Sequence, residues 1–182
     1  MQLPKISTQR VAITGIMLSL ALILSLIETA LPPIMPVVPY AKIGFSNIVL
    51  LVALMLLGYK SCILILIIKC LLVGIFSGNI FSIVYSLPAG IISYSVTALI
   101  INIKQISLVA VSTVGSIVHN IVQILVASIV IGHTIWLTLP YLLLLGGAVG
   151  VGIGVVTFVV LKYLPHSLIL QYSETPKNKN KI

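Results

Sequence analysis

Long apolar segments, separated by short polar or proline-rich turns, make up most of this chain. A transmembrane helix needs about 20 mostly apolar residues to cross the hydrocarbon core of a bilayer. We expect six such helices, at 11–31, 43–57, 61–76, 80–101, 106–131 and 139–163. The pattern therefore predicts an all-α membrane protein built as a bundle of six transmembrane helices.

The segment 11–31 is longer than the apolar region of a signal peptide, and no small-residue cleavage site follows it, so we expect a retained helix. A stiff extended loop is expected over 32–40, because four of its nine residues are proline.

Composition excludes a soluble domain. The chain is 60% hydrophobic and only 7% charged, whereas a soluble protein must cover itself with polar groups. The net charge of +8 does not indicate nucleic-acid binding, since the cations stand singly at the ends of apolar segments. That placement is typical of the positive-inside bias of membrane proteins. The residues expected on one, cytoplasmic side are Lys5, Arg10, Lys60, Lys104, Lys162, Lys177, Lys179 and Lys181.

This topology predicts three parts: a cytoplasmic N-terminus at 1–10, a transmembrane domain at 11–163 and a cytoplasmic tail at 164–182. Both termini then lie on the cytoplasmic side of the cell membrane, while Lys42 and the proline loop lie on the outer side.

Lys69 is the most informative residue, because it lies near the middle of the apolar segment 61–76. A charge at membrane depth costs about 3 kcal/mol on insertion scales. Lys69 is about nine residues, or ~13 Å, from the cytoplasmic turn, which is too far for its stem to reach water easily. It therefore either contacts a ligand in an internal cavity or forms a structural ion pair with Glu28.

The segment 106–131 carries a cluster of three polar residues, His119, Asn120 and Gln123. Residues 119 and 123 share one helix face at a spacing of four. The cluster predicts contact with a ligand, hydrogen bonds between helices, or both.

Three further residues, Lys42, Asn47 and Asn79, are expected to complete a polar ring around Lys69 in the outer half of the bundle. Tyr85 would add a hydroxyl group or a stacking surface, although a tyrosine in a helix bundle usually serves packing. Together with Lys69, Lys42 indicates a cavity that favours anions, although a lone lysine in its position is usually interfacial.

Small residues at a spacing of four let helices approach closely. Gly146, Gly150 and Gly154 form such a face, against another helix or another subunit, and Gly15 with Ser19 forms a smaller one.

No catalytic site is expected. The sequence has no phosphate-binding glycine loop, no carboxylate pair and no Ser-His-acid set. Cys62 and Cys70 are about 12 Å apart along a helix, too far to form a disulfide, and no metal-ligand set is available. We therefore predict a binding protein, not an enzyme, with no cofactor and no metal.

The chain resembles the Gx transporter family, also labelled heptaprenyl diphosphate synthase component I. The resemblance is carried by KIGFSNIV (42–49), SGNIFS (77–82) and GSIVHNIVQ (115–123), within roughly residues 10–163. The six short spans are also similar to the substrate-binding S-components of energy-coupling factor transporters.

This resemblance implies a subunit that binds a small vitamin-like molecule from outside and works with a membrane T-component and two ATPases. Gly15 and Ser19 are then expected at the T-component contact. The candidate substrates are a flavin or an isoprenoid or quinone precursor, with its negative group near Lys69.

A second hypothesis is a non-catalytic membrane subunit that anchors a prenyl diphosphate synthase or an extracytosolic electron-transfer assembly. The chain itself cannot hold the Mg²⁺–diphosphate cluster of such a synthase, because Glu28 and Glu174 are its only acidic residues. A channel or secondary carrier is a third hypothesis, which the small number of spans disfavours.

Overall fold

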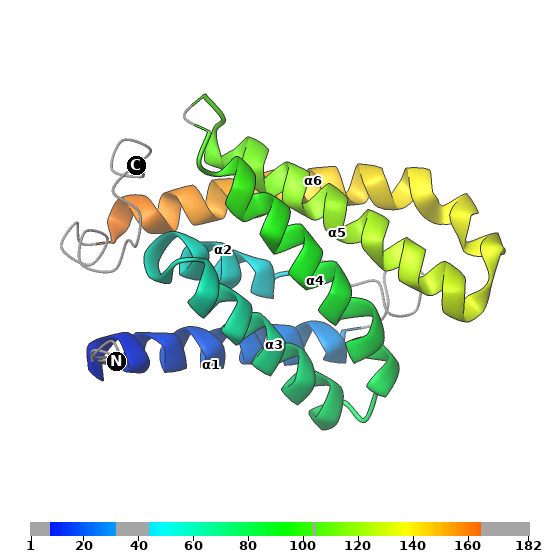
Figure 1. The fold of residues 1–182 in the computed structure, drawn as a ribbon, viewed down its shortest axis with the longest axis horizontal. Helices are drawn as coiled ribbons and strands as arrows, with labels where there is room; N and C mark the ends of the chain where they lie inside the picture. The colour runs from blue at the N-terminus through cyan, green and yellow to red at the C-terminus, as the bar shows by residue number, and fades with distance from the viewer. Residues whose placement is uncertain (1–7, 32–43, 104, 165–182) are drawn as a thin grey trace, which may run out of the picture.

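The computed structural model describes residues 8–31, 44–103 and 105–164. Within these ranges every regular element is a helix (Figure 1). In chain order the elements are α1 (Thr8–Ala30), α2 (Ser46–Leu57), α3 (Tyr59–Phe76), α4 (Ile80–Ile100), α5 (Leu108–Ile131), the short 3-10 helix η1 (His133–Thr138) and α6 (Leu139–Tyr163). The predicted all-α fold is thus confirmed over the described part of the chain.

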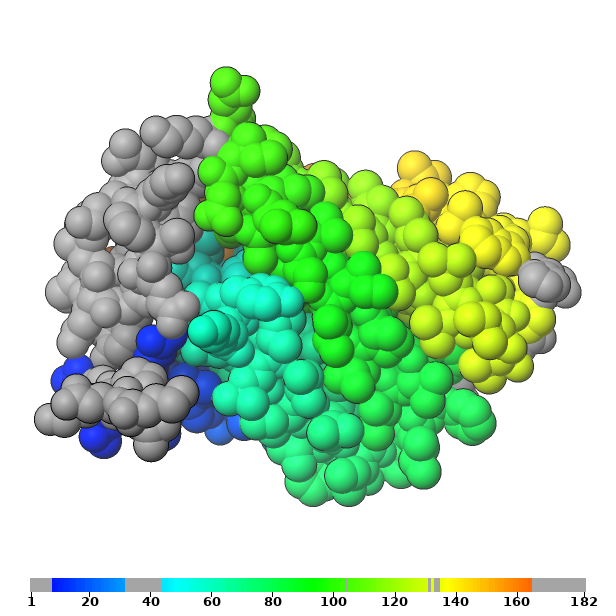
Figure 2. Space-filling model, in the orientation of Figure 1, coloured from blue at the N-terminus to red at the C-terminus, as the bar shows by residue number. Residues whose placement is uncertain are grey.

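Five of the helices are long and apolar enough to cross a membrane, and α2 is shorter. Many large apolar side chains lie on the outer surface, such as Ile129 at 84% exposure and Leu137 at 81%. In Figure 2 the side chains of α3, α4 and α5 cover the face turned to the viewer. An apolar exterior of this extent suits hydrocarbon rather than water, so the protein is a membrane protein.

The helix α2 differs from the predicted second span at 43–57. It has 12 residues, or a length of about 18 Å, which is shorter than the hydrocarbon core of a bilayer. Ten of its residues are buried, against α1, α3 and α6. A helix that is apolar on every side belongs in the interior, so α2 is an internal helix packed against three of the long ones.

Polar side chains fix several helix ends. The side chain of Asn79 accepts a hydrogen bond from the Ser82 N–H at 3.3 Å and caps α4, and Ser107 caps α5 in the same way. Arg10 in α1 donates to the Leu57 carbonyl at 2.8 Å. A cation at this position complements the negative C-terminal end of α2 and ties it to α1.

The predicted glycine face of α6 packs against α5 of the same chain. A Cβ atom added at Gly146, Gly150 or Gly154 would lie 2.2, 2.7 or 2.6 Å from the nearest atom of α5. Gly15 differs, since nothing lies within 4 Å of an added Cβ there, and Ser19 beside it is exposed. The described part of the chain therefore leaves this smaller face of α1 uncovered.

The first turn of α1 and the last turn of α6 lie at the same end of the bundle (Figure 1). Arg10 and the turn between α2 and α3 lie at this end too, as their hydrogen bond requires. An even number of helix passes produces this arrangement. The cytoplasmic location of this end stays a prediction. The predicted proline loop at 32–40 lies outside the described residues.

Candidate functional site

A cavity of about 60 Å³ lies inside the bundle, in the half opposite the described chain ends. All six α-helices contribute to its wall, and more than half of the described lining residues have polar side chains. The polar residues are Ser25, Glu28, Ser46, Asn47, Lys69, Ser82, Ser86, Ser116, His119, Asn120 and Gln123. The predicted hollow beside Lys69 is therefore present.

Lys69 reaches the cavity from α3 and is buried, with 8% of its surface exposed. Leu66, Cys70 and Val73 line the cavity beside it, because spacings of three, four and seven residues fall on one helix face. The Lys69 ammonium donates a hydrogen bond to Ser46 Oγ at 2.9 Å, at the first residue of α2. The hydrogen-bond acceptor for this ammonium group is thus a neutral hydroxyl group, which does not balance the positive charge.

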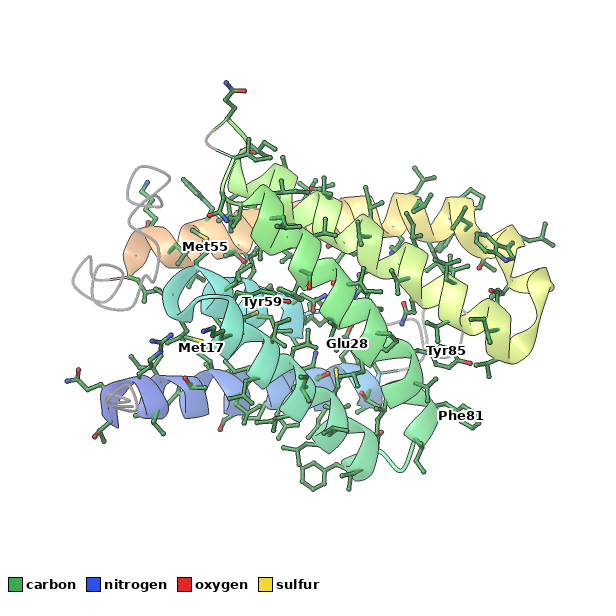
Figure 3. The ribbon with its side chains drawn as sticks, viewed as in Figure 1. Met17, Glu28, Met55, Tyr59, Phe81 and Tyr85 are labelled. Atoms are coloured by element: carbon green, nitrogen blue, oxygen red, sulfur yellow. The ribbon has the colours of Figure 1, made fainter. Side chains whose placement is uncertain are left out.

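Glu28 lines the same cavity from the C-terminal part of α1 (Figure 3) and is 7% exposed. Its carboxylate accepts a hydrogen bond from the backbone N–H of Gly44, just before α2. Gly44 has a φ of 90°, in the left-handed region that favours glycine, and an added Cβ would lie 2.6 Å from the Asn47 side chain. Glycine therefore lets the chain turn so that its N–H points at the carboxylate.

The three polar residues of α5 have different surroundings. Asn120 Nδ2 donates to the Leu142 carbonyl at 2.7 Å and so joins α5 to α6. His119 Nδ1 lies 3.5 Å from Ser93 Oγ of α4. Gln123 is buried, with 6% of its surface exposed, and its amide has no hydrogen-bond partner among the described residues.

Two predicted site residues lie away from the cavity wall. Asn79 is the N-cap of α4, and Tyr85 belongs to an apolar cluster with Ile124 and Leu142. Figure 3 shows Phe81, one turn before Tyr85, pointing away from the bundle. Lys42, another predicted site residue, lies outside the described residues.

The sequence reasoning missed the serines of the cavity wall. Ser46 contacts Lys69, and Ser25, Ser82, Ser86 and Ser116 add further hydroxyl groups. A signal existed in α4, where Ser82, Ser86 and Gly90 recur every four residues and so share one helix face. Serine is common in membrane helices, however, and a single sequence does not tell an inward serine from one that bonds its own backbone.

A second, smaller cavity of about 20 Å³ lies beside the first and shares Asn47, Ser116 and His119 with it. Ser93, Thr97 and Ser112 also line it, so it is polar and has room for about one water molecule.

The donors and acceptors of the cavity wall suit the binding of a small polar group. Cys62 and Cys70 are buried thiols that form no disulfide with each other, and no group of three His, Cys, Asp or Glu residues is close enough to hold a metal ion in the described ranges. What the cavity offers is one ammonium group, one carboxylate and several hydroxyl and amide groups. These groups can hold and orient a small polar head group.

Comparison with known proteins identifies the family. The family model described as heptaprenyl diphosphate synthase component I matches residues 17–160, which includes every described residue of the cavity wall. Searches of curated proteins and of solved structures give no match. Since the match covers most of the chain, this membrane protein belongs to the heptaprenyl diphosphate synthase component I family, as the resemblance of its polar segments predicted.

Proposed function

We propose that this protein is a membrane-embedded binding subunit that holds the polar head of a small amphipathic cofactor precursor in the cavity beside Lys69. Its role is that of an S-component in an energy-coupling factor transporter. The single observation that carries the proposal is a buried ammonium group on the wall of a polar cavity inside an apolar bundle.

The volume of the cavity narrows the choice of ligand. A cavity of about 150 Å³ admits benzene in a soluble protein. At about 60 Å³, the cavity has room for several water molecules or one compact head group, but not for the ring system of a flavin. An isoprenoid precursor with a compact acidic head suits this space better than a flavin or a quinone ring, with its head in the cavity and its apolar part between the helices or in lipid.

The surroundings of Lys69 support a ligand contact. Burying an ammonium group is costly, and one neutral hydroxyl group offsets little of that cost. An acidic head group supplies a negative charge in direct contact with this ammonium group. The amide of Gln123 and the hydroxyl groups of Ser86 and Ser116 line the same cavity and can complete its hydrogen bonds.

Partners follow from this role. A T-component and two ATPases would convert binding into transport. The uncovered small-residue face of α1 at Gly15 and Ser19 is available for a membrane partner, because nothing in the described chain packs there.

A second candidate function is favoured by the family match. The family description names one component of a synthase, which implies a partner component that carries the chemistry. With two acidic residues in the whole chain, this subunit lacks the carboxylates that would hold Mg²⁺ and diphosphate. It would then be a non-catalytic anchor or a carrier of the prenyl precursor for that partner.

The test is native mass spectrometry of the detergent-purified protein and of the variant Lys69→Met. A hydrogen bond to a charged group contributes about 1.5–3 kcal/mol, which is a factor of about 10 to 100 in affinity. We expect a small molecule retained on the wild type and at least tenfold less on the variant, with unchanged helical content by circular dichroism.

Lys60→Met is the matched control, because Lys60 is exposed at the start of the same helix. It should keep the ligand. Equal retention by all three proteins, no retained molecule on any, or loss of fold in Lys69→Met alone would contradict the proposal. Copurification of a T-component with ATPases favours transport, and copurification of a synthase favours the anchor.

A further inference from the structure

The N-terminal end of α2 forms part of the cavity wall, through Gly44, Ser46 and Asn47. The first N–H groups of a helix point toward its N-terminal end and carry a partial positive charge, which favours a bound anion. The Lys69 ammonium is bonded to Ser46 Oγ, at the first residue of α2. Two sources of positive potential therefore lie on the same part of the wall.

This position already holds an anion from the protein. The Glu28 carboxylate accepts the Gly44 N–H, and both residues line the cavity. A second acidic group cannot join it without repulsion, since like charges in a buried site disfavour one another strongly.

A second observation indicates that the cavity is built for an occupant. Gln123 lines it with an amide that is 6% exposed and forms no hydrogen bond within the described ranges. Leaving a buried amide without a partner is costly, so a ligand or water must satisfy it.

We infer that Glu28 is an internal substitute for the ligand: its carboxylate occupies the place that an acidic head group, a carboxylate or phosphate, takes at the N-terminal end of α2. Binding of the ligand displaces Glu28 from the Gly44 N–H and gives that N–H and Lys69 a new anion. Because Gly44 lies just before α2 and Glu28 belongs to α1, the exchange releases one contact between α1 and the segment that leads into α2. This inference rests on the proposed function. It adds that the head group of the ligand is acidic and that the Glu28 carboxylate competes with it for the same position.

The experiment measures binding of decyl phosphate to the full chain in detergent, for the wild type and for Glu28→Gln. Glutamine has the shape of glutamate and an oxygen for the Gly44 N–H, but it carries no charge. We expect Glu28→Gln to bind decyl phosphate at least tenfold more tightly than the wild type, because the competing anion is gone. Decanol, which lacks the acidic group, should bind both proteins equally, and inorganic phosphate shows whether the head group alone suffices or a lipid-like tail is needed.

The reverse result would overturn the inference. If Glu28→Gln binds decyl phosphate as weakly as the wild type or more weakly, Glu28 contacts the ligand or serves only the fold. Glu28→Ala provides a second test of the same change. Failure of both variants to fold would also overturn the inference, since a carboxylate that a ligand displaces cannot be essential for folding. Retention of a ligand that depends on Lys69, without tighter binding in the Glu28 variants, would refute this inference alone and leave the proposed function intact.

Discussion

The packing of α6 against α5 makes a sharp prediction about two glycines. A Cβ atom at Gly150 would lie 2.7 Å from the Thr113 Cα, and one at Gly154 would lie 2.6 Å from the Val109 Cα. Both neighbours are backbone atoms of α5, so no side chain can rotate away to make room. The variants Gly150→Ala and Gly154→Ala must therefore push the two helices apart.

The size of the effect follows from two opposing terms. Overpacking a close contact costs about 1–3 kcal/mol. Replacing glycine by alanine inside a helix is favourable by up to ~1 kcal/mol. Gly147 and Gly152 supply the control, because they lie in the same helix and an added Cβ there has nothing within 4 Å. All four variants gain the same helix propensity from alanine. The difference in unfolding free energy between the Gly150 and Gly154 variants and the Gly147 and Gly152 variants should therefore be the cost of overpacking, about 1–3 kcal/mol.

The measurement is the loss of helical circular dichroism as sodium dodecyl sulfate is added to the protein in a mild detergent. Gly150→Ala and Gly154→Ala should unfold at lower dodecyl sulfate than the wild type, whereas Gly147→Ala and Gly152→Ala should unfold at equal or higher concentrations. If Gly150→Ala is as stable as Gly147→Ala, α6 does not pack on α5 through this face. The glycine face would then serve another chain.

Two further variants test helix ends by the same titration. Asn79→Ala removes the cap of α4 and should lower the free energy of unfolding by about 1 kcal/mol. Asn79→Asp keeps an acceptor for the Ser82 N–H and should be as stable as the wild type. An equal loss of stability in both variants would contradict the role of Asn79 as a cap. Arg10→Gln should destabilise the contact between α1 and the end of α2 by about 1 kcal/mol, because it removes the charge that complements the Leu57 carbonyl. Lys60→Gln is the control for lost positive charge at this end, and an equal effect of both changes would show that Arg10 acts only through general charge.

Much of the site was predictable because polar groups are rare in this sequence. Lys69 and Glu28 stand out in a chain with 7% charged residues, and both line the cavity. His119, Asn120 and Gln123 stand out in the same way. Their separate surroundings were not predictable, since an i, i+4 spacing places residues on one face of a helix but does not say which atoms of other helices lie opposite.

Tyr85 and Asn79 show where a count of polar residues misleads. Tyr85 has a hydroxyl group but packs among apolar side chains, and the side chain of Asn79 caps its own helix. Ser46 shows the reverse case: its hydroxyl group was not predicted to be part of the site, yet it accepts the hydrogen bond of the Lys69 ammonium.

The sequence by itself determined the class of protein and the approximate extents of the five long helices, because apolar length and turn residues are local properties of the chain. The bounds of α6, Leu139–Tyr163, coincide with the predicted segment. Only the tertiary structure decided that α2 lies inside the bundle, that the glycines of α6 meet α5, and that Lys69 bonds to Ser46 while Glu28 bonds to Gly44. Those outcomes depend on which faces of distant segments meet, and that is settled by the packing of all the helices together.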